Sequence, residues 1–318
     1  MKKEKISIIV PCYNEEESLP IFFKELDRIS REMKKVDFEF LFINDGSRDK
    51  TLDILRTMAH DDDRVRYISF SRNFGKEAGV WAGLENVVGD YVAVMDADMQ
   101  DPPSKLIEMY DILSKNEEYD CVGLYTVKHE DYSAFRRFCT NIWYKIIAKI
   151  SNNRQVPGVR DFRLMRRNMV DAVLKMKEYN RYTKGIFSFV GFNTFWLEFK
   201  TGKRVAGTSK FNFWKLFKYA LEGIVSFSTT PLILSAIVGI IFCLIAFITI
   251  LVIIIKTLAF GDPVSGWPSL ACIIIFASGV QLFFLGVFGL YLSKIYLEVK
   301  NRPIYIVKET EKSTKNKD

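Results

Sequence analysis

Cysteine is scarce in this sequence, and its placement forms no pattern. The five cysteines never form a Cys-x-x-Cys pair, and they lie at Cys12, Cys121, Cys139, Cys243 and Cys272. An odd number of scattered thiols argues against a disulfide framework and against a zinc site. The sequence instead fits a reducing, cytosolic compartment.

A signal peptide and a nucleic-acid-binding motif are also missing. The apolar run Ile6 to Val10 is too short for a signal peptide and meets Pro11 at once. We therefore expect the first domain to stay in the compartment where it is made. The balance is nevertheless basic, with 45 Lys and Arg against 38 Asp and Glu, a net charge of +7. This excess points to an anionic membrane surface or to phosphorylated substrates, and we expect no nucleic acid partner.

The C-terminal third contains two long stretches without any charge. Pro231 to Ile255 and Trp267 to Leu292 each exceed the roughly 20 apolar residues that span a bilayer. A buried core helix is the alternative for either stretch, but two in succession favour membrane helices. We expect transmembrane helices at 230–256 and 266–293, joined as a hairpin by a short linker.

Basic residues flank this hairpin on its outer sides. Those before and after it are Lys203, Arg204, Lys210, Lys215, Lys218, Lys294, Lys300, Arg302 and Lys308. The linker has only Lys256, beside Asp262. Because positive charge stays on the cytoplasmic side, we expect a multi-pass protein of the cell membrane. The N-terminal domain and both termini, including a basic tail at 294–318, would be cytoplasmic.

Residues 1–203 alternate between short apolar runs and helical patterns. The sequence predicts strands at 6–10, 38–43, 65–70 and 91–95, and helices at 19–33, from about 49, and at 75–87. Such alternation is typical of an α/β domain with a mostly parallel sheet covered by helices on both faces. Ligands of these sheets bind beyond the carboxyl ends of the strands.

Polar residues follow these predicted strands. Pro11 to Glu15 and Asn44 to Ser47 come directly after two of them. Asp96 and Asp98 end a third at alternate positions, with Gln100 close behind. Hard carboxylate and amide oxygens suit Mg²⁺ or Mn²⁺ better than zinc. Asp-rich turns are often only structural, but this placement predicts a metal site at Asp96, Asp98 and Gln100.

Several motifs resemble the inverting family-two glycosyltransferases with a GT-A, Rossmann-like fold, and specifically the polyisoprenyl-phosphate glycosyltransferases. They are VPCYNEEESL (10–19), FINDGSRDKT (42–51), SFSRNFGKEAGVWAGL (69–84), MDADMQDPP (95–103), DFRLMRR (161–167) and RVAGTSKFNF (204–213). The likeness covers nearly the whole chain. It is nearest to bacterial undecaprenyl-phosphate glucosyltransferases and is similar to dolichyl-phosphate mannose synthases.

The resemblance implies roles for individual residues. Those expected to bind the nucleotide-sugar are Pro11, Tyr13, Glu15, Asp45, Lys76, Asp96 and Ala97. Asp45 can also act as an Asp-Gly turn, and Lys76 as a surface charge. Asp161 and Asp98 are the expected catalytic carboxylates. Because a phosphate acceptor already carries negative charge, Asp161 can act either as a base or by positioning that acceptor.

The resemblance also implies a site for the lipid phosphate. Its expected residues are Arg136, Arg163, Arg204, Ser209 and Lys210. Two amphipathic segments, at about 133–151 and at 204–229, have the apolar and basic faces of helices that lie on a membrane. Packing of the first against the domain core is its alternative.

We therefore expect transfer of glucose from UDP-glucose to undecaprenyl phosphate with inversion, with Mg²⁺ or Mn²⁺ as cofactor, for cell-envelope glycosylation. UDP-N-acetylglucosamine or another nucleotide-sugar as donor, and a protein or glycan as acceptor, are the alternatives. A processive polysaccharide synthase fits less well because the sequence has too few membrane helices and no Q-x-x-R-W signature. A non-enzymatic scaffold fits less well because the acidic residues are intact. The resemblance also implies a homo-oligomer, a tetramer.

Overall fold

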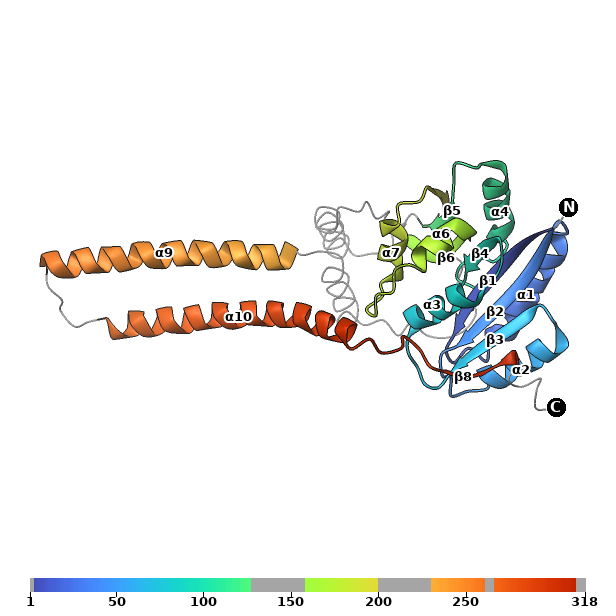
Figure 1. Ribbon diagram of the computed structural model, residues 1–318, viewed down its shortest axis with the longest axis horizontal. Helices are drawn as coiled ribbons and strands as arrows, with labels where there is room; N and C mark the ends of the chain where they lie inside the picture. The colour runs from blue at the N-terminus through green and yellow to red at the C-terminus, as the bar shows by residue number, and fades with distance from the viewer. Residues whose placement is uncertain (1–2, 127–157, 200–229, 261–265, 313–318) are drawn as a thin grey trace. The chain divides into compact units, whose positions relative to one another are not determined.

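The computed structural model describes residues 3–126, 158–199, 230–260 and 266–312 (Figure 1). The chain divides into two compact units. The first comprises Met1–Asn212 together with Arg302–Asp318, and the second comprises Phe213–Asn301.

The first unit is built on an eight-stranded sheet with the order β7-β5-β6-β4-β1-β2-β3-β8. The strands are β1 (Glu4–Cys12), β2 (Val36–Asn44), β3 (Val65–Phe70), β4 (Tyr91–Val94), β5 (Cys121–Tyr125), β6 (Val159–Arg166), β7 (Thr194–Glu198) and β8 (Val307–Thr310). The central strands β3, β2, β1 and β4 are parallel, which confirms the prediction of a mostly parallel sheet. β6 and β8 run antiparallel to their neighbours, which the sequence did not predict.

Helices cover both faces of this sheet. One face packs against α1 (Leu19–Glu32), α2 (Thr51–Asp61) and α4 (Lys105–Lys115) in the main apolar core. The other face carries α3 (Lys76–Asn86), α6 (Arg167–Val173) and α7 (Thr183–Phe189). Because side chains alternate along a strand, Ile8 of β1 joins the first face and Ile9 lies against α3.

Two glycines bring α3 unusually close to the sheet. A Cβ atom at Gly83 would lie 2.2 Å from Cγ2 of Ile9, and one at Gly79 would lie 3.3 Å from Cβ of Pro11. Only glycine permits this approach of a helix to a strand. The first turn of α3, which carries Lys76, is therefore held at the carboxyl end of β1.

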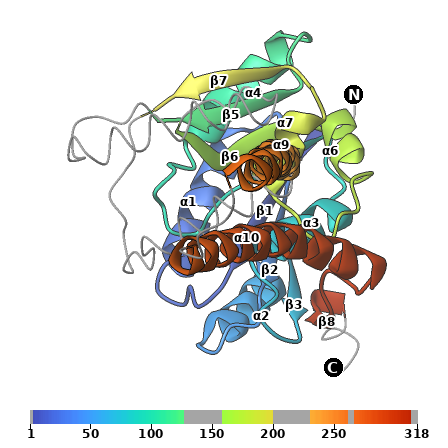
Figure 2. The same cartoon turned by 90° about the vertical axis from the view of Figure 1, so that its left-hand side faces the viewer.

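The segment after the second unit returns to the first and completes its sheet. β8 pairs antiparallel with the edge strand β3, beside which it lies in Figure 2. Glu309 accepts hydrogen bonds from both Nε and Nη2 of Arg56, at 2.9 and 2.8 Å. The Tyr305 ring stacks on Phe70 with the ring centroids 4.9 Å apart. Residues 302–311 are thus part of the first unit, whereas the sequence suggested only a basic tail.

The second unit contains α9 (Thr230–Phe260) and α10 (Trp267–Val299). The Phe242 and Phe276 rings contact each other with their centroids 5.6 Å apart. Among the described residues, Phe276–Val299 is long and apolar enough to cross a membrane, by length and composition. Within α9 the described apolar stretch, Ile237–Thr249, is shorter.

Candidate active site

The predicted nucleotide-sugar residues lie where the strand order of the sheet reverses. β1 has β2 on one side and β4 on the other, so the loops that follow β1 and β4 are neighbours at the carboxyl edge of the sheet. This switch point is the usual ligand site of an open α/β sheet. It brings the loop from Tyr13 to Glu15 close to Asp96 and Asp98.

The loop after β1 is tied to the loop after β2. The Asn14 amide donates to Ser47 Oγ at 3.0 Å, and Arg48 N donates back to Asn14 Oδ1 at 2.9 Å. Tyr13 is 40% exposed at the rim, which leaves its ring open to a ligand. Burial raises the pKa of Glu15, and the charges of Asp98 and Asp96 raise it further, against a hydrogen bond from Ser18. Glu15 therefore lies close enough to Asp96 and Asp98 to feel their charges.

Asp45 holds the loop that leads into α3. Its Oδ1 accepts from the Phe74 amide at 2.6 Å and its Oδ2 from the Gly75 amide at 2.9 Å. Gly46, with φ +63°, lies so close to this loop that a Cβ would be 2.4 Å from the Arg72 carbonyl carbon. Asp45 is only 4% exposed. These contacts hold the loop that leads to Lys76, and the nucleotide-binding role of Asp45 stays a prediction.

Strand pairing places Asp161 beside the acidic motif. Val94 of β4 pairs with Arg163 of β6, and continuing this antiparallel register sets Asp96 opposite Asp161. The Lys76 ammonium lies between the two carboxylates. Its Nζ is 2.7 Å from Asp96 Oδ1 and 2.5 Å from Asp161 Oδ2. Three predicted site residues thus form one cluster.

A second lysine completes this cluster. Lys184 Nζ lies 3.1 Å from Asp161 Oδ1, so each carboxylate oxygen of Asp161 faces a different ammonium group. Burial alone would raise the pKa of Asp161, but the charges and hydrogen bonds of Lys76 and Lys184 hold it well below its usual value. Asp161 is therefore a stable carboxylate and, as a proton acceptor, weak.

The acidic motif turns sharply after Asp98. Asp98 Oδ1 accepts from the Gln100 amide at 3.0 Å, and Met99 has a φ of +60°. The Gln100 side-chain oxygen accepts from Arg160 Nη2 at 3.1 Å. Arg160 also donates from Nε to the buried Asp101 at 2.7 Å. One lone pair of the Gln100 side-chain oxygen is thus engaged by a guanidinium, and the role of Gln100 as a metal ligand stays a prediction.

Arg163 differs from its predicted role. It is 4% exposed, its guanidinium carbon lies 4.0 Å from the centre of the Phe187 ring, and its Nε has no hydrogen-bond partner. Burial lowers the pKa of this arginine. A guanidinium covered by α7 is not open to a lipid phosphate, and the physical reason is its inward position on β6.

The other predicted residues divide into two groups. Ala97 is buried at 3% exposure, and Pro11 is the penultimate residue of β1, paired with Ile43. Arg136, Arg204, Ser209, Lys210 and both amphipathic segments, 133–151 and 204–229, lie outside the described residues. Among the described residues, no three His, Cys, Asp or Glu side chains come together as a metal-holding group.

Sequence reasoning missed Arg160 and Lys184. Arg160 fixes the end of the acidic motif to β6, and Lys184 pairs with Asp161. No sequence motif contains either residue, because the carboxylate that each one contacts is distant in the sequence. The structure links Lys184 to a predicted site residue through its neighbours. Glu77, which follows Lys76, accepts hydrogen bonds from the amide and hydroxyl of Thr183, which precedes Lys184.

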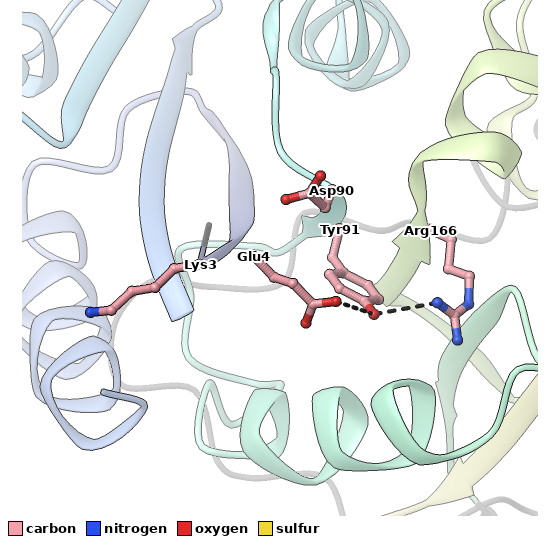
Figure 3. Close-up of a pocket in the computed structure, with 5 residues that line it drawn as sticks. All are labelled: Lys3, Glu4, Asp90, Tyr91 and Arg166. Atoms are coloured by element: carbon pink, nitrogen blue, oxygen red, sulfur yellow. Dashed lines mark hydrogen bonds between the residues drawn. The ribbon is translucent and has the colours of Figure 1, made fainter. Parts of the chain in front are cut away.

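A polar pocket of about 260 Å³ lies at the opposite, amino end of the strands (Figure 3). Glu4 and Arg166 point towards the Tyr91 hydroxyl, whereas Lys3 points away. The Tyr91 hydroxyl accepts from Arg166 Nη1 at 3.3 Å. The pocket contains none of the predicted site residues.

This chain is similar to known proteins both in a family model and over most of its length. The model of the family described as glycosyl transferase family 2 matches residues 7–174. The SfII prophage-derived bactoprenol glucosyl transferase of Shigella flexneri is 43% identical over 97% of this chain and 99% of its own length. The prophage bactoprenol glucosyl transferase homolog of Escherichia coli (strain K12) is 42% identical over 97% of this chain and 100% of its own length.

Among solved structures, the chain is similar to glucosyl-3-phosphoglycerate synthase from Mycobacterium tuberculosis in complex with Mn²⁺, UDP-glucose and phosphoglyceric acid. The TM-score is 0.47 at 18% identity, covering 70% of this chain and 78% of that one.

Proposed function

Because this chain belongs to glycosyl transferase family 2, we propose that it transfers glucose from UDP-glucose to undecaprenyl phosphate with inversion. The observation that carries the proposal is the 43% identity to a bactoprenol glucosyl transferase over 97% of this chain. This identity extends through both units, including the apolar helices of the second unit. A shared second unit therefore favours the same class of lipid acceptor.

The donor would lie in the crevice between β1 and β4. Asp96 and Asp98 fit Mg²⁺ or Mn²⁺, because they offer hard oxygens at the edge of that crevice, where the Lys76 ammonium already lies against Asp96. Such a cation, when bound, would neutralise the charge on the departing nucleoside diphosphate. Tyr13 and Glu15 line the side of the crevice proposed for the nucleoside, and Asp45 supports that side through the loop before α3.

The acceptor needs charge compensation more than it needs a base. A phosphate monoester carries roughly −1.5 to −2 charges near neutral pH, so its oxygen is already a nucleophile. In the proposed step this oxygen forms the bond to the anomeric carbon, and the bond to the diphosphate breaks with its electron pair leaving on UDP. Asp161, engaged by two ammonium groups, would position Lys76 and Lys184 between the two anionic substrates. Holding the reactants together is itself a large part of such catalysis.

The second unit would anchor the enzyme in the membrane. α9 and α10 contact each other and expose large apolar side chains along their length, which supports a hairpin that crosses the bilayer twice. The flanking lysines and arginines favour cytoplasmic termini and a cytoplasmic catalytic unit. Segments 133–151 and 204–229, with Arg136, Arg204, Ser209 and Lys210, would hold the lipid phosphate at the membrane surface. A homo-oligomer, a tetramer, is part of this proposal.

The test is transfer of radiolabel from a panel of nucleotide-sugars to undecaprenyl phosphate by the full chain in detergent. We expect lipid-soluble product from UDP-glucose with Mg²⁺ or Mn²⁺ and none with EDTA. An Asp96→Asn variant gives the matched blank for the metal-dependent reaction.

Two other outcomes have clear meanings. Product from UDP-N-acetylglucosamine alone would retain the reaction class and change the sugar. No lipid-soluble product from any donor, with folded protein that still binds UDP, would refute the lipid acceptor and favour a protein or glycan acceptor.

A further inference from the structure

We propose that Lys184 contacts the phosphate of the acceptor, and that Glu77 and Arg163 are positioning residues that hold α7 so that Lys184 can do so. This inference rests on the proposed function, since it names a residue that recognises the same acceptor. It concerns a lysine that no motif marks and that lies in the described part of the chain.

The two lysines of the cluster differ in how many carboxylate groups they contact. Lys76 Nζ lies within hydrogen-bond distance of both oxygens of Asp96 and of Asp161 Oδ2, so it bridges two carboxylates. Lys184 Nζ has one carboxylate partner, Asp161 Oδ1 at 3.1 Å, and a distant carbonyl, that of Val159 at 3.4 Å. The Lys184 side chain is 33% exposed, so a ligand can reach it.

An ammonium group has three hydrogen-bond donors and can hold a carboxylate and a phosphate at once. Lys184 can therefore keep Asp161 while it donates to a phosphate oxygen. Lys76, which faces the metal-binding motif, is placed to serve the donor side. This division supplies one cation to each of the two anionic substrates, whose mutual repulsion would otherwise keep them apart.

Two contacts hold α7 in place, one to α3 and one to β6. At its first turn, Glu77 of α3 accepts from the Thr183 amide at 2.9 Å and from the Thr183 hydroxyl. One turn further on, Phe187 covers the Arg163 guanidinium at 4.0 Å. Lys184 and Phe187 are three residues apart and share a helix face.

The same register is present on the strand. Asp161 and Arg163 alternate along β6 and therefore point to the same face. Lys184 meets Asp161 just as Phe187 meets Arg163, so the position of the helix and the position of the lysine are set together. This also accounts for an arginine that is buried with an unpaired Nε: its partner is a ring, not a phosphate.

The experiment compares Lys184→Gln with the wild-type full chain in detergent. We expect the KM for undecaprenyl phosphate to rise about 10- to 100-fold, the loss expected for one charge-assisted hydrogen bond. The KM for UDP-glucose and the affinity for UDP should change much less than the lipid KM, because Lys76 stays paired with Asp96 on the donor side. Lys184→Arg should recover most of the lipid affinity because it restores the charge.

Two controls separate phosphate contact from other effects. Lys177→Gln removes the same charge from an exposed position and should leave the lipid KM unchanged. A short, water-soluble isoprenyl phosphate should show the same loss with Lys184→Gln, since the lost contact is to the phosphate and not to the lipid chain. Thr183→Val, which removes one of the two bonds to Glu77, should raise the lipid KM by a smaller factor.

An unchanged lipid KM in Lys184→Gln, with active wild-type enzyme, would overturn this inference alone. So would a rise in the KM for UDP-glucose of equal size. If the wild-type enzyme transferred sugar to no isoprenyl phosphate, the proposed function would fail, and this inference with it.

Discussion

Two charged clusters lie at opposite ends of the same sheet and are built differently. At the amino end, Arg166 donates to backbone carbonyls of Tyr119 at 2.9 Å and of Leu113 at 2.6 Å. At the carboxyl end, Lys76 bridges the side chains of Asp96 and Asp161, and Lys184 pairs with Asp161. The amino-end cluster joins backbone segments, whereas the carboxyl-end cluster joins movable groups.

This difference suggests which cluster serves stability and which serves chemistry. Backbone carbonyls at the end of α4 cannot move away without disturbing the helix, so Arg166 is fixed by the fold. The side chains of Asp161 and Lys184 are about one-third exposed, at 31% and 33%, and can exchange partners when a ligand arrives. Substitutions at the two ends should therefore separate activity from folding.

The largest effect is expected at the carboxyl end. Asp96→Asn and Asp161→Asn should each lower kcat by about 10³-fold or more, because each removes a charge that organises the reacting groups. Thermal unfolding and UDP binding by Asp161→Asn should stay close to wild type. Turnover within a few-fold of wild type in either variant would contradict its assignment, and joint loss of turnover and folding would erase the contrast between the two ends.

Lys76→Gln should sharpen the contrast through the metal. Removing the ammonium that lies 2.7 Å from Asp96 should lower kcat by about 10²-fold and tighten Mn²⁺ binding several-fold, because a competing cation is gone. A Mn²⁺ titration followed by electron paramagnetic resonance measures the second effect. The control is Lys105→Gln, which removes a half-buried lysine paired with Glu108. An unchanged Mn²⁺ affinity would mean that Lys76 and the metal do not share Asp96.

At the amino end, Arg166→Ala should cost about 2–3 kcal/mol of stability and leave the KM values unchanged. Its cost comes from the carbonyls of Leu113 and Tyr119, which lose a charged donor. Arg28→Ala removes an exposed arginine paired only with Glu25 and Glu32, and should cost less than about 1 kcal/mol. Denaturant unfolding of the full chain in detergent compares them. Equal stability of the two variants would refute a structural role for Arg166.

The smallest effect concerns the added strand β8. Glu309→Gln should lower the free energy of unfolding by about 1 kcal/mol at neutral pH, because Glu309 accepts hydrogen bonds from Nε and Nη2 of Arg56. The hydrogen bond from Arg56 holds the pKa of Glu309 below its usual value.

The pH dependence follows from that direction. The stabilisation is present above the unfolded-state pKa of about 4.3 and is lost as the pH falls through the lower, folded-state pKa. The two proteins should therefore become equally stable in acid. Glu17→Gln removes a carboxylate from an exposed position and is the control, with a stability at neutral pH close to wild type. A difference that grew on acidification would contradict the pairing.

Local patterns predicted most of the central sheet. The run Ile6 to Val10 and the helix from Leu19 appeared near their predicted bounds, because burial of apolar residues sets both periods. The acidic pair at Asp96 and Asp98 was found from its place after a strand. The predicted contact of Arg163 with a lipid phosphate does not fit the structure, because Arg163 is buried beneath the Phe187 ring. The sequence alone does not show that an arginine near an aspartate is covered in this way.

Sequence by itself determined the parallel α/β core, the long apolar helices of the second unit and the polar ends of the strands, since each depends on composition and local period. Only the tertiary structure decided that Asp161 lies opposite Asp96, that Lys184 meets it, and that β8 completes the sheet. Contacts of this kind join residues that are far apart in the sequence. Lys76 and Asp96 are 20 positions apart, and Arg56 and Glu309, which link α2 to β8, are 253 positions apart. Their pairing depends on strand register and helix docking, which the packed core as a whole selects.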